Sequence, residues 1–245
     1  FDVIVGNPPW EEATLEEDEF WMRYAPGLMG KSSNEQERIK FELRENRPDL
    51  VKKYDQEVDA QSKLRDILKN GPYPGMGTGD PDLYKAFTWR FWSIVADDGE
   101  VGVVLPRSAF IAAGSEKFRR KLLELSRVSD LTFIKNKDGW IFDNVEPRYT
   151  IALLAFIKSA PTDDTNLPLR GPFADLSSYQ EGLRRGPFQF SLDQAKQWTG
   201  SAAFPLLPPD PTSVEVFKQL STHPPLDRDE PGEWRARPNR EFDAT

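Results

Sequence analysis

The sequence predicts an α/β fold with a largely parallel sheet, and three observations lead to this prediction. Short apolar runs rich in β-branched residues are typical of buried strands, and such runs occupy residues 1–6, 100–106, 130–137 and 149–158. Segments with helical spacing of apolar residues lie between the first three runs. Glycine, proline and aspartate turns separate strands from helices. Strands that alternate with helices in this way form a parallel sheet with helices against its faces.

Composition limits the classes of protein that fit the chain. No apolar run in the 245 residues approaches the ~20 residues of a membrane helix, and no signal peptide is visible. Cysteine is absent, which excludes disulfides and thiolate metal sites. The single histidine, His223, lies in a proline-rich stretch, so we expect no metal site and no histidine-based catalysis. The net charge of −8 argues against a complete DNA-binding protein but leaves room for a local basic patch.

The first run, FDVIVG, ends on glycine, and the motif NPPW follows it at residues 7–10. Two consecutive prolines stop a strand because proline donates no ladder hydrogen bond. Phe1 falls inside this strand with neither a methionine nor a cap before it. We therefore expect the chain to be a piece of a longer protein, in which strand 1–6 becomes an exposed sheet edge when the piece is isolated.

Residues 11–79 read as an insertion into the α/β pattern. An acidic, aromatic stretch comes first, and a helical hairpin is predicted at 32–70. Ser33 and Gln36 resemble a capping box at the start of the hairpin. Pro48 suits the first turn of its second helix.

The second half of the chain continues the pattern and then changes. Residues 83–95 are predicted to form a helix with an aromatic face, and residues 108–126 a further helix. The last two strands are expected to pair antiparallel at the end of the sheet. After Lys158 the proline- and threonine-rich composition predicts a linker, with one short helix near 212–221.

The NPPW motif has the chemistry of a site for a planar molecule that carries an amino group. Residues that precede proline are biased to extended backbone, so the carbonyl of Pro8 projects from a stiff chain. The side-chain oxygen of Asn7 and this carbonyl can accept two hydrogens from one exocyclic amine, and Trp10 offers a flat face for stacking. Ligands of α/β sheets bind at the carboxyl ends of strands, and adenine or cytosine fits these groups best. A base in a duplex has to be extruded before it reaches such a site.

FDVIVG followed by NPPW closely resembles the catalytic motif of amino-methyltransferases that use S-adenosylmethionine. The further resemblance is to the gamma class of adenine-N6 DNA methyltransferases of type IIG restriction-modification and phage-defence systems. Other segments resemble this family in its order along the chain: DLYKAF with DDGEVGVVLPRSAFI, then GWIFDNVEPRYTIALLAF, then FPLLPPDPTSVEVFKQL and WRARPNREFDAT.

The resemblance implies a role for each matching residue. Asn7 and the carbonyl of Pro8, followed by Pro9 in the motif, would accept hydrogen bonds from the N6 amine of a flipped adenine. Trp10 would stack on the base. Phe142, in the segment WIFDN, would press on the base from elsewhere.

The resemblance also implies the architecture. The chain would be the second half of a Rossmann-like methyltransferase sheet, with residues 1–160 in the catalytic domain and 161–245 as a linker and the start of a target-recognition region. S-adenosyl-L-methionine would be the cofactor, with Phe87 beside its adenine ring and the main binding loop upstream of Phe1. Double-stranded DNA and the rest of the parent chain would be the partners, in the cytoplasm and away from membranes. The isolated chain is expected to be inactive.

Several alternatives stay open. Enzymes that methylate a protein glutamine or an RNA base share an NPPY-type motif, and cytosine-N4 methylation is a further possibility, although that class more often has Ser in place of Asn7. The chain could also be a scaffold whose helical insertion contacts a partner. Basic residues gather between Arg107 and Lys137, either as a DNA-facing surface or as a solvated helix face.

Overall fold

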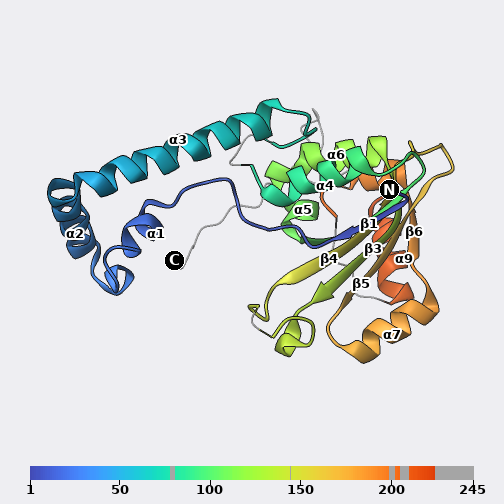
Figure 1. Ribbon diagram of the computed structural model, residues 1–245. Coiled ribbons are helices and arrows are strands. Elements are labelled where there is room, and N and C mark those ends of the chain that lie inside the picture. The colour runs from blue at the N-terminus through green and yellow to red at the C-terminus, as the bar shows by residue number, and fades with distance from the viewer. Residues whose placement is uncertain (78–80, 144, 199–201, 205–209, 224–245) are drawn as a thin grey trace, which may run out of the picture.

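The computed structural model describes residues 1–77, 81–143, 145–198, 202–204 and 210–223 (Figure 1). Its centre is a six-stranded sheet in the order β1-β2-β4-β3-β5-β6. The strands are β1 (Val3–Gly6), β2 (Glu100–Pro106), β3 (Arg127–Lys135), β4 (Thr150–Ile157), β5 (Asn166–Phe173) and β6 (Phe188–Ser191). The helices are α1 (Glu17–Met22), α2 (Ser33–Asn46), α3 (Pro48–Asn70), α4 (Leu83–Ile94), α5 (Ser108–Ile111), α6 (Glu116–Leu125), α7 (Leu176–Arg185), α8 (Leu192–Gln197) and α9 (Pro211–Leu220).

The sheet is mixed, although four of its strands run in the same direction. β1 pairs parallel with β2, and β3 pairs parallel with β5. β4 lies antiparallel between β2 and β3, and β6 runs antiparallel to β5. The predicted α/β fold and the antiparallel β3–β4 pair are confirmed. The expectation of largely parallel pairing is wrong, and so is the position of the pair at the end of the sheet, because both strands lie inside it. The chain reverses after β3 and β4 enters the middle of the sheet, which replaces one parallel contact by two antiparallel ones.

The main core lies between one face of the sheet and a layer formed by α4, α5 and α6 (Figure 1). Along β2, Val101, Val103 and Leu105 are buried and alternate with half-buried residues. This alternation is what one strongly covered face requires. At the free edge of the sheet, Val3 and Val5 of β1 are 61% and 81% exposed, so strand 1–6 is the edge strand that was expected.

Residues 14–77, which include α1, α2 and α3, form an arm that projects from the body of the protein (Figure 1). The arm packs on its own small cluster of buried residues, which are Phe20, Trp21, Leu28 and Leu50. Within the described ranges, no helix has both the length and the apolar composition to cross a membrane.

The arm's helices begin close to the predicted residues. The capping box is formed by Ser32 and Glu35, one residue before the predicted pair of Ser33 and Gln36, because Ser32 is the last extended residue before α2. Its backbone N–H donates to the Glu35 carboxylate at 3.4 Å. Pro48 begins α3, as predicted.

A short stem joins the arm to the body. The backbone N–H of Ala13 donates to the carbonyl of Pro81 at 3.0 Å, and the N–H of Leu83 donates to the carbonyl of Glu11 at 2.9 Å. Between these bonds, Glu12 and Asp82 form an antiparallel β-bridge. The insertion therefore leaves and rejoins the sheet at nearly the same point.

The linker predicted after Lys158 is wrong over residues 166–191. That segment forms β5, α7 and β6, which extend the same sheet, and Leu167, Leu169 and Phe173 are buried. Prolines at 168 and 172 obscured the strand in the sequence, because proline is unusual within a sheet. The helix expected near 212–221 is confirmed as α9.

The single helix predicted for 108–126 is divided into α5, a 3-10 turn (Ala113–Ser115) and α6. The chain breaks at Ala112, whose backbone is extended with ψ 140°. Arg119, which is 1% exposed, accounts for the stability of this break. Its guanidinium donates to the carbonyls of Ala109 at 3.1 Å, Ala112 at 2.8 Å and Ala202 at 3.0 Å.

We expect Arg119→Met to lower the free energy of unfolding by roughly 3 kcal/mol, because three buried carbonyls lose a charged donor. The matched control is Arg120→Met, because Arg120 pairs with Glu116 at 2.7 Å with its side chain 40% exposed. The control is expected to cost less than about 1 kcal/mol. Urea unfolding followed by circular dichroism measures both, and equal losses would contradict the role given to Arg119.

Candidate functional site

The carboxyl ends of β1, β2, β3 and β5 lie along one border of the sheet, since these four strands share a direction. This border, the carboxyl edge, is distinct from the free lateral edge along β1. The segments that follow these strands are residues 7–10 after β1, Arg107 after β2, and a loop at 136–149 between β3 and β4. The backbone N–H of Arg107 donates to the carbonyl of Thr150 at 3.1 Å, which ties the end of β2 to the start of β4. Ligands of α/β sheets bind at this kind of edge.

Asn7 is the first residue after β1, and it is exposed. Among the described residues its side-chain amide has no hydrogen-bond partner, and the carbonyl of Pro8 accepts no hydrogen bond. Pro8 is buried, whereas Pro9 is exposed. A buried proline between Asn7 and the rest of the motif holds the backbone, so the two oxygen acceptors stay in a stiff segment with their lone pairs available.

Trp10 is half-buried against the main core. Its indole N–H donates to the carbonyl of Val104 at 3.3 Å. The last β1–β2 pair is Gly6 with Val103, so Val104 is the first residue of β2 beyond that ladder. The indole therefore takes the place of a missing backbone donor and fixes Trp10 beside the end of the sheet.

Phe87 lies on α4 and is 41% exposed, so it is not a core residue. Its ring centroid is 6.2 Å from that of Phe91, one helical turn further along. Phe91 in turn packs on Gly6, where a β-carbon would lie only 2.8 Å from the ring. Phe87 is thus an exposed aromatic residue of α4, joined through Phe91 to the end of β1.

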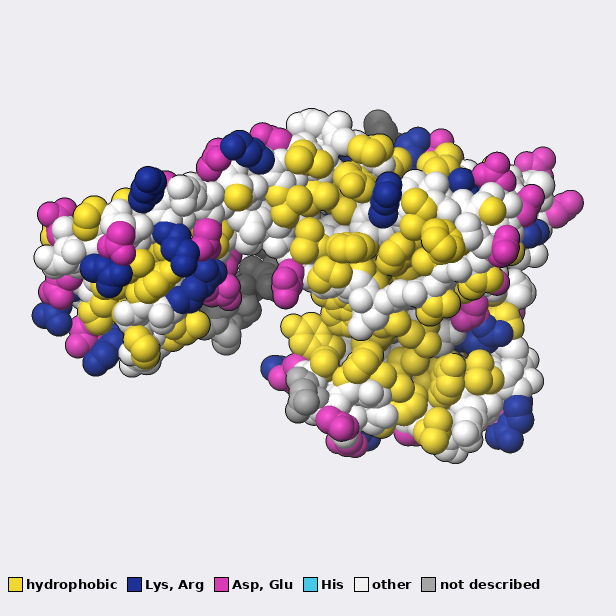
Figure 2. Space-filling model, in the orientation of Figure 1, with side chains coloured by type: hydrophobic (Ala, Val, Ile, Leu, Met, Phe, Trp, Pro, Cys, Tyr) yellow, Lys and Arg dark blue, Asp and Glu magenta, His cyan; other side chains and the backbone are white. Residues whose placement is uncertain are grey.

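Phe142 is half-buried in the loop at 136–149. The loop begins directly after β3 and ends at β4, so it lies at the same edge as Asn7 with β2 and β4 between them. The backbone of Phe142 is bound by the buried side chain of Asn136, a residue that the sequence did not single out. Figure 2 shows that the surface is hollowed between the arm, at the left, and the body of the protein, at the right.

A cavity of about 240 Å³ lies next to the stem, lined among others by Glu12, Asp82, Tyr84, Lys85 and Ser108. Lys85 is 3% exposed, and its ammonium lies 2.6 Å from the Asp82 carboxylate. The Tyr84 hydroxyl lies 3.4 Å from that of Ser115. Burial, the largest cause, raises the pKa of Tyr84 to about 12, which keeps the phenol neutral.

The basic residues between Arg107 and Lys137 do not act as one free surface. Arg119 is buried among backbone carbonyls, so its part in a DNA-facing patch is wrong. Lys121 lies 2.8 Å from Glu124, and Arg120 is paired with Glu116. In the described ranges no group of three or more histidine or acidic side chains is placed to hold a metal ion.

No family model and no curated protein matches the chain. Among solved structures, the chain is similar to a modification subunit of a putative type I restriction enzyme from Vibrio vulnificus YJ016, with 16% identity and a TM-score of 0.46 over 89% of this chain and 40% of that one. A type I restriction-modification system gives 14% identity and a TM-score of 0.48 over 90% and 41%. The type ISP restriction-modification enzyme LlaBIII bound to DNA gives 19% identity and a TM-score of 0.40 over 75% and 11%.

The chain therefore spans less than half the length of each of these structures. Identity and TM-score are low in all three comparisons, so the assignment of function rests on the site residues themselves. The structure places Asn7, Pro8 and Trp10 at the end of β1 and Phe142 in a loop at the same edge, and Phe87 is linked to the end of β1 through Phe91.

We expect the wild-type protein to lose stability relative to Tyr84→Phe as the pH rises from 10 to 12. Burial raises the pKa of Tyr84 above its ordinary value, so the folded protein keeps a proton that the unfolded chain releases. The stabilisation that the neutral Tyr84 contributes is complete below about pH 10 and is lost as the pH rises through about 12. This loss lowers the free energy of unfolding by about 2 kcal/mol.

Urea unfolding at pH 9 and at pH 12 measures the difference between the two proteins. Tyr149→Phe is the control, because Tyr149 is 53% exposed. A difference between wild type and Tyr84→Phe that does not change with pH would contradict the burial of an intact phenol.

Proposed function

We propose that the chain is part of a site-specific DNA methyltransferase that transfers a methyl group to the N6 amine of a flipped adenine, in restriction-modification or phage defence. The observation that carries this proposal is the end of β1. An exposed Asn7 amide and the carbonyl of Pro8, both without partners among the described residues, stand beside an indole anchored to β2.

The two acceptors act on the amine electrostatically. The lone pair of an aromatic amine is delocalised into the ring, which makes the nitrogen a poor nucleophile. Hydrogen bonds from the two N–H groups to the Asn7 side-chain oxygen and the Pro8 carbonyl favour a pyramidal nitrogen and stabilise the positive charge that develops there. Because Pro8 and Pro9 restrict the backbone, the acceptors need little reorganisation when the base arrives.

Aromatic faces hold the extruded base in this proposal. Unstacking a base costs a few kcal/mol, and stacking on an aromatic side chain returns about 1–3 kcal/mol per base. Trp10 offers one face, and its bond to Val104 limits the rotations that would move it away. Phe142 is the second candidate, since its loop lies at the same edge of the sheet.

S-adenosyl-L-methionine, when bound, would supply the methyl group as an electrophilic sulfonium. The residues present fit part of such a site, because Phe87 is an aromatic side chain that is 41% exposed and packs near Phe91, which contacts Gly6 at the end of β1. The main binding loop is expected in another part of the parent chain.

The exposed edge of the sheet supports a role within a larger enzyme. Phe1, Val3 and Val5 are 78%, 61% and 81% exposed, and β1 has no strand on its outer side among the described residues. We propose that the cofactor-binding half of the parent chain pairs here. Since β5 and β6 extend the same sheet, the catalytic part would continue beyond residue 160 to about residue 191, and the target-recognition region would begin after it.

We expect the isolated chain 1–245 to show no micromolar binding of S-adenosyl-L-methionine and no methylation of DNA, because the proposed main cofactor loop is outside it. Isothermal titration calorimetry measures the binding. Micromolar affinity would show that the described residues form a complete cofactor site.

In the full-length enzyme, Asn7→Ala is expected to lower kcat for DNA methylation by about 10²–10³-fold, as the loss of one preorganised group does elsewhere. Asn46→Ala is the matched control, because Asn46 is an exposed residue on the arm whose amide donates only to the Glu42 carbonyl at 2.9 Å. Transfer of a radiolabelled methyl group, followed by hydrolysis to nucleosides, measures the rate and identifies the product.

The proposal expects N6-methyladenine as the product, abolished by Asn7→Ala and retained in the control. N4-methylcytosine as the product would show that cytosine is the substrate instead of adenine. Label found in RNA or in a protein glutamine in preference to DNA would likewise identify that alternative substrate. Unchanged methylation by Asn7→Ala together with loss of assembly would favour the scaffold function.

A further inference from the structure

We propose that Asn136 is a positioning residue that sets the backbone of Phe142 at the edge of the sheet before a base arrives. This inference rests on the proposed function and deepens it, since it assigns a specific buried side chain to the base-contacting loop. Asn136 follows β3 directly and is fully buried, with 0% exposure.

The side chain of Asn136 uses both ends of its amide on the loop. Its Nδ2 donates to the carbonyls of Phe142 and Val145, each at 3.0 Å. Its Oδ1 accepts from the backbone N–H of Phe142 at 3.1 Å and of Ile141 at 3.4 Å. An asparagine amide has two donors and an oxygen with two lone pairs, so all of its capacity is used within this one loop.

Phe142 depends on Asn136 more than the rest of the loop does. The ends of the loop have other ties: the N–H of Asn136 donates to the carbonyl of Tyr149 at 2.9 Å, and the Trp140 indole donates to that of Lys135 at 2.8 Å. The Trp140 ring also lies 6.3 Å from the ring of Tyr179 on α7. By contrast, the N–H of Phe142 donates within the described residues only to the Asn136 side chain, and its carbonyl accepts from Asn136 at 3.0 Å and from the N–H of Val145 at 3.4 Å.

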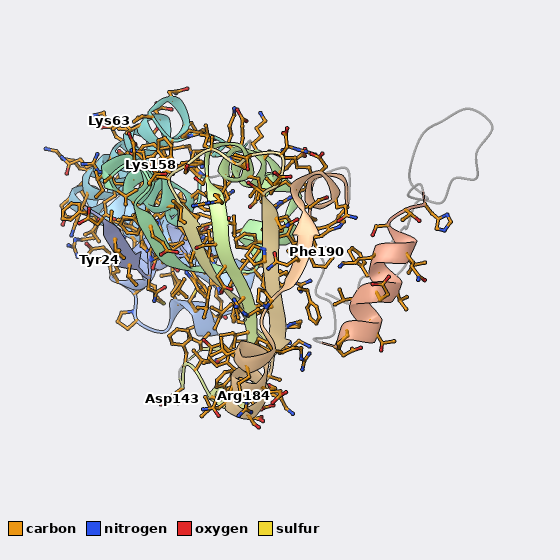
Figure 3. The ribbon with its side chains drawn as sticks, turned by 90° about the vertical axis from the view of Figure 1, so that its right-hand side faces the viewer. Tyr24, Lys63, Asp143, Lys158, Arg184 and Phe190 are labelled. Carbon is orange, nitrogen blue, oxygen red and sulfur yellow. The ribbon has the colours of Figure 1, made fainter. Side chains whose placement is uncertain are left out.

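The loop lies at the end of the molecule where the site is. Figure 3 shows Asp143, the neighbour of Phe142, at the lower end of the molecule. The carboxyl ends of β3 and β1 share one edge of the sheet. The four hydrogen bonds of the Asn136 side chain, called the clamp below, therefore hold the loop at the edge that carries Asn7. A residue that fixes one backbone position there can set the place of an aromatic ring without touching substrate.

No common substitution preserves the four bonds. Aspartate retains the two acceptor contacts but presents a carboxylate oxygen to the carbonyls of Phe142 and Val145, where the amide donated. Alanine removes all four contacts, so that of these backbone groups only the Phe142 carbonyl keeps a partner within the described residues, the N–H of Val145. These two variants therefore separate the loss of the donors from the loss of the whole clamp.

The structural half of the proposal is tested by amide hydrogen exchange on the full-length enzyme. Asn136→Ala is expected to accelerate exchange at Ile141 and Phe142 while the amides of β4 remain protected. Asn136→Asp, which keeps the acceptor oxygens, is expected to retain part of this protection and serves as the second variant if the alanine variant does not fold. Unchanged exchange at Phe142 in both variants would overturn the clamp.

The functional half is tested by a double-mutant cycle with Phe142→Ala. Misplacing a group in a site costs about 10²-fold, so Asn136→Ala and Phe142→Ala are each expected to lower kcat/KM for DNA by about that factor. If Asn136 acts through Phe142, the double variant is no slower than Phe142→Ala alone. The KM for S-adenosyl-L-methionine should not change, and Asn46→Ala is again the control.

Base extrusion gives a readout that a loss of stability would not produce. With 2-aminopurine at the target position, wild-type enzyme is expected to raise the fluorescence on binding DNA, and Asn136→Ala to reduce that rise at a temperature where it is still folded. Multiplicative losses in the cycle, or a full fluorescence rise with Asn136→Ala, would overturn the positioning role. Absence of adenine methylation by the wild type would instead overturn the proposed function, while the exchange data would still decide whether the clamp exists.

Discussion

The hydrogen bond from the Trp10 indole to the carbonyl of Val104 fixes the geometry on which the candidate site depends. Pairing between β1 and β2 ends at Gly6 and Val103, and the next residues of the chain include two prolines that cannot donate. A carbonyl of β2 is thereby left for a side chain to bind. The indole binds it, so the same prolines that stop the strand also create the place where Trp10 is anchored. Asn7, one residue beyond the strand, remains in solvent.

Buried polar side chains that bind backbone shape the edge of the sheet that carries Asn7. Arg119 holds the break between α5 and α6, and Asn136 holds the loop after β3. In both cases the partners are main-chain groups that regular secondary structure would otherwise have paired. The backbone groups that Arg119 and Asn136 bind are therefore paired although the backbone there is irregular, which is the usual condition for a stable interior.

The elements with strong periodicity could be predicted from the sequence, and those stabilised by single contacts could not. β2 and α4 were recognised because several apolar residues repeat at the spacing of a strand or a helix. β5 was missed because its two prolines are typical of loops, although its neighbours Leu167 and Leu169 are buried. The break at Ala112 depends on a guanidinium seven residues away, which no local pattern reveals.

The sequence indicates the role of Asn136 only weakly, since an asparagine between a strand and a glycine-containing turn often binds nearby backbone. At the site, the motif located Asn7 and Trp10, but the bond to Val104 joins residues 94 positions apart and needed the fold.

The stem between residues 11–13 and 81–83 has a consequence for how such a protein can diversify. Its paired backbones close the insertion before the arm begins, so the ends of the arm are held together whatever lies between them. Loop-closure entropy grows only slowly with length once the ends are fixed. Because the stem fixes both ends of the arm, related proteins could lengthen, shorten or replace it and so acquire new surface. The residues that follow β1 would keep their positions.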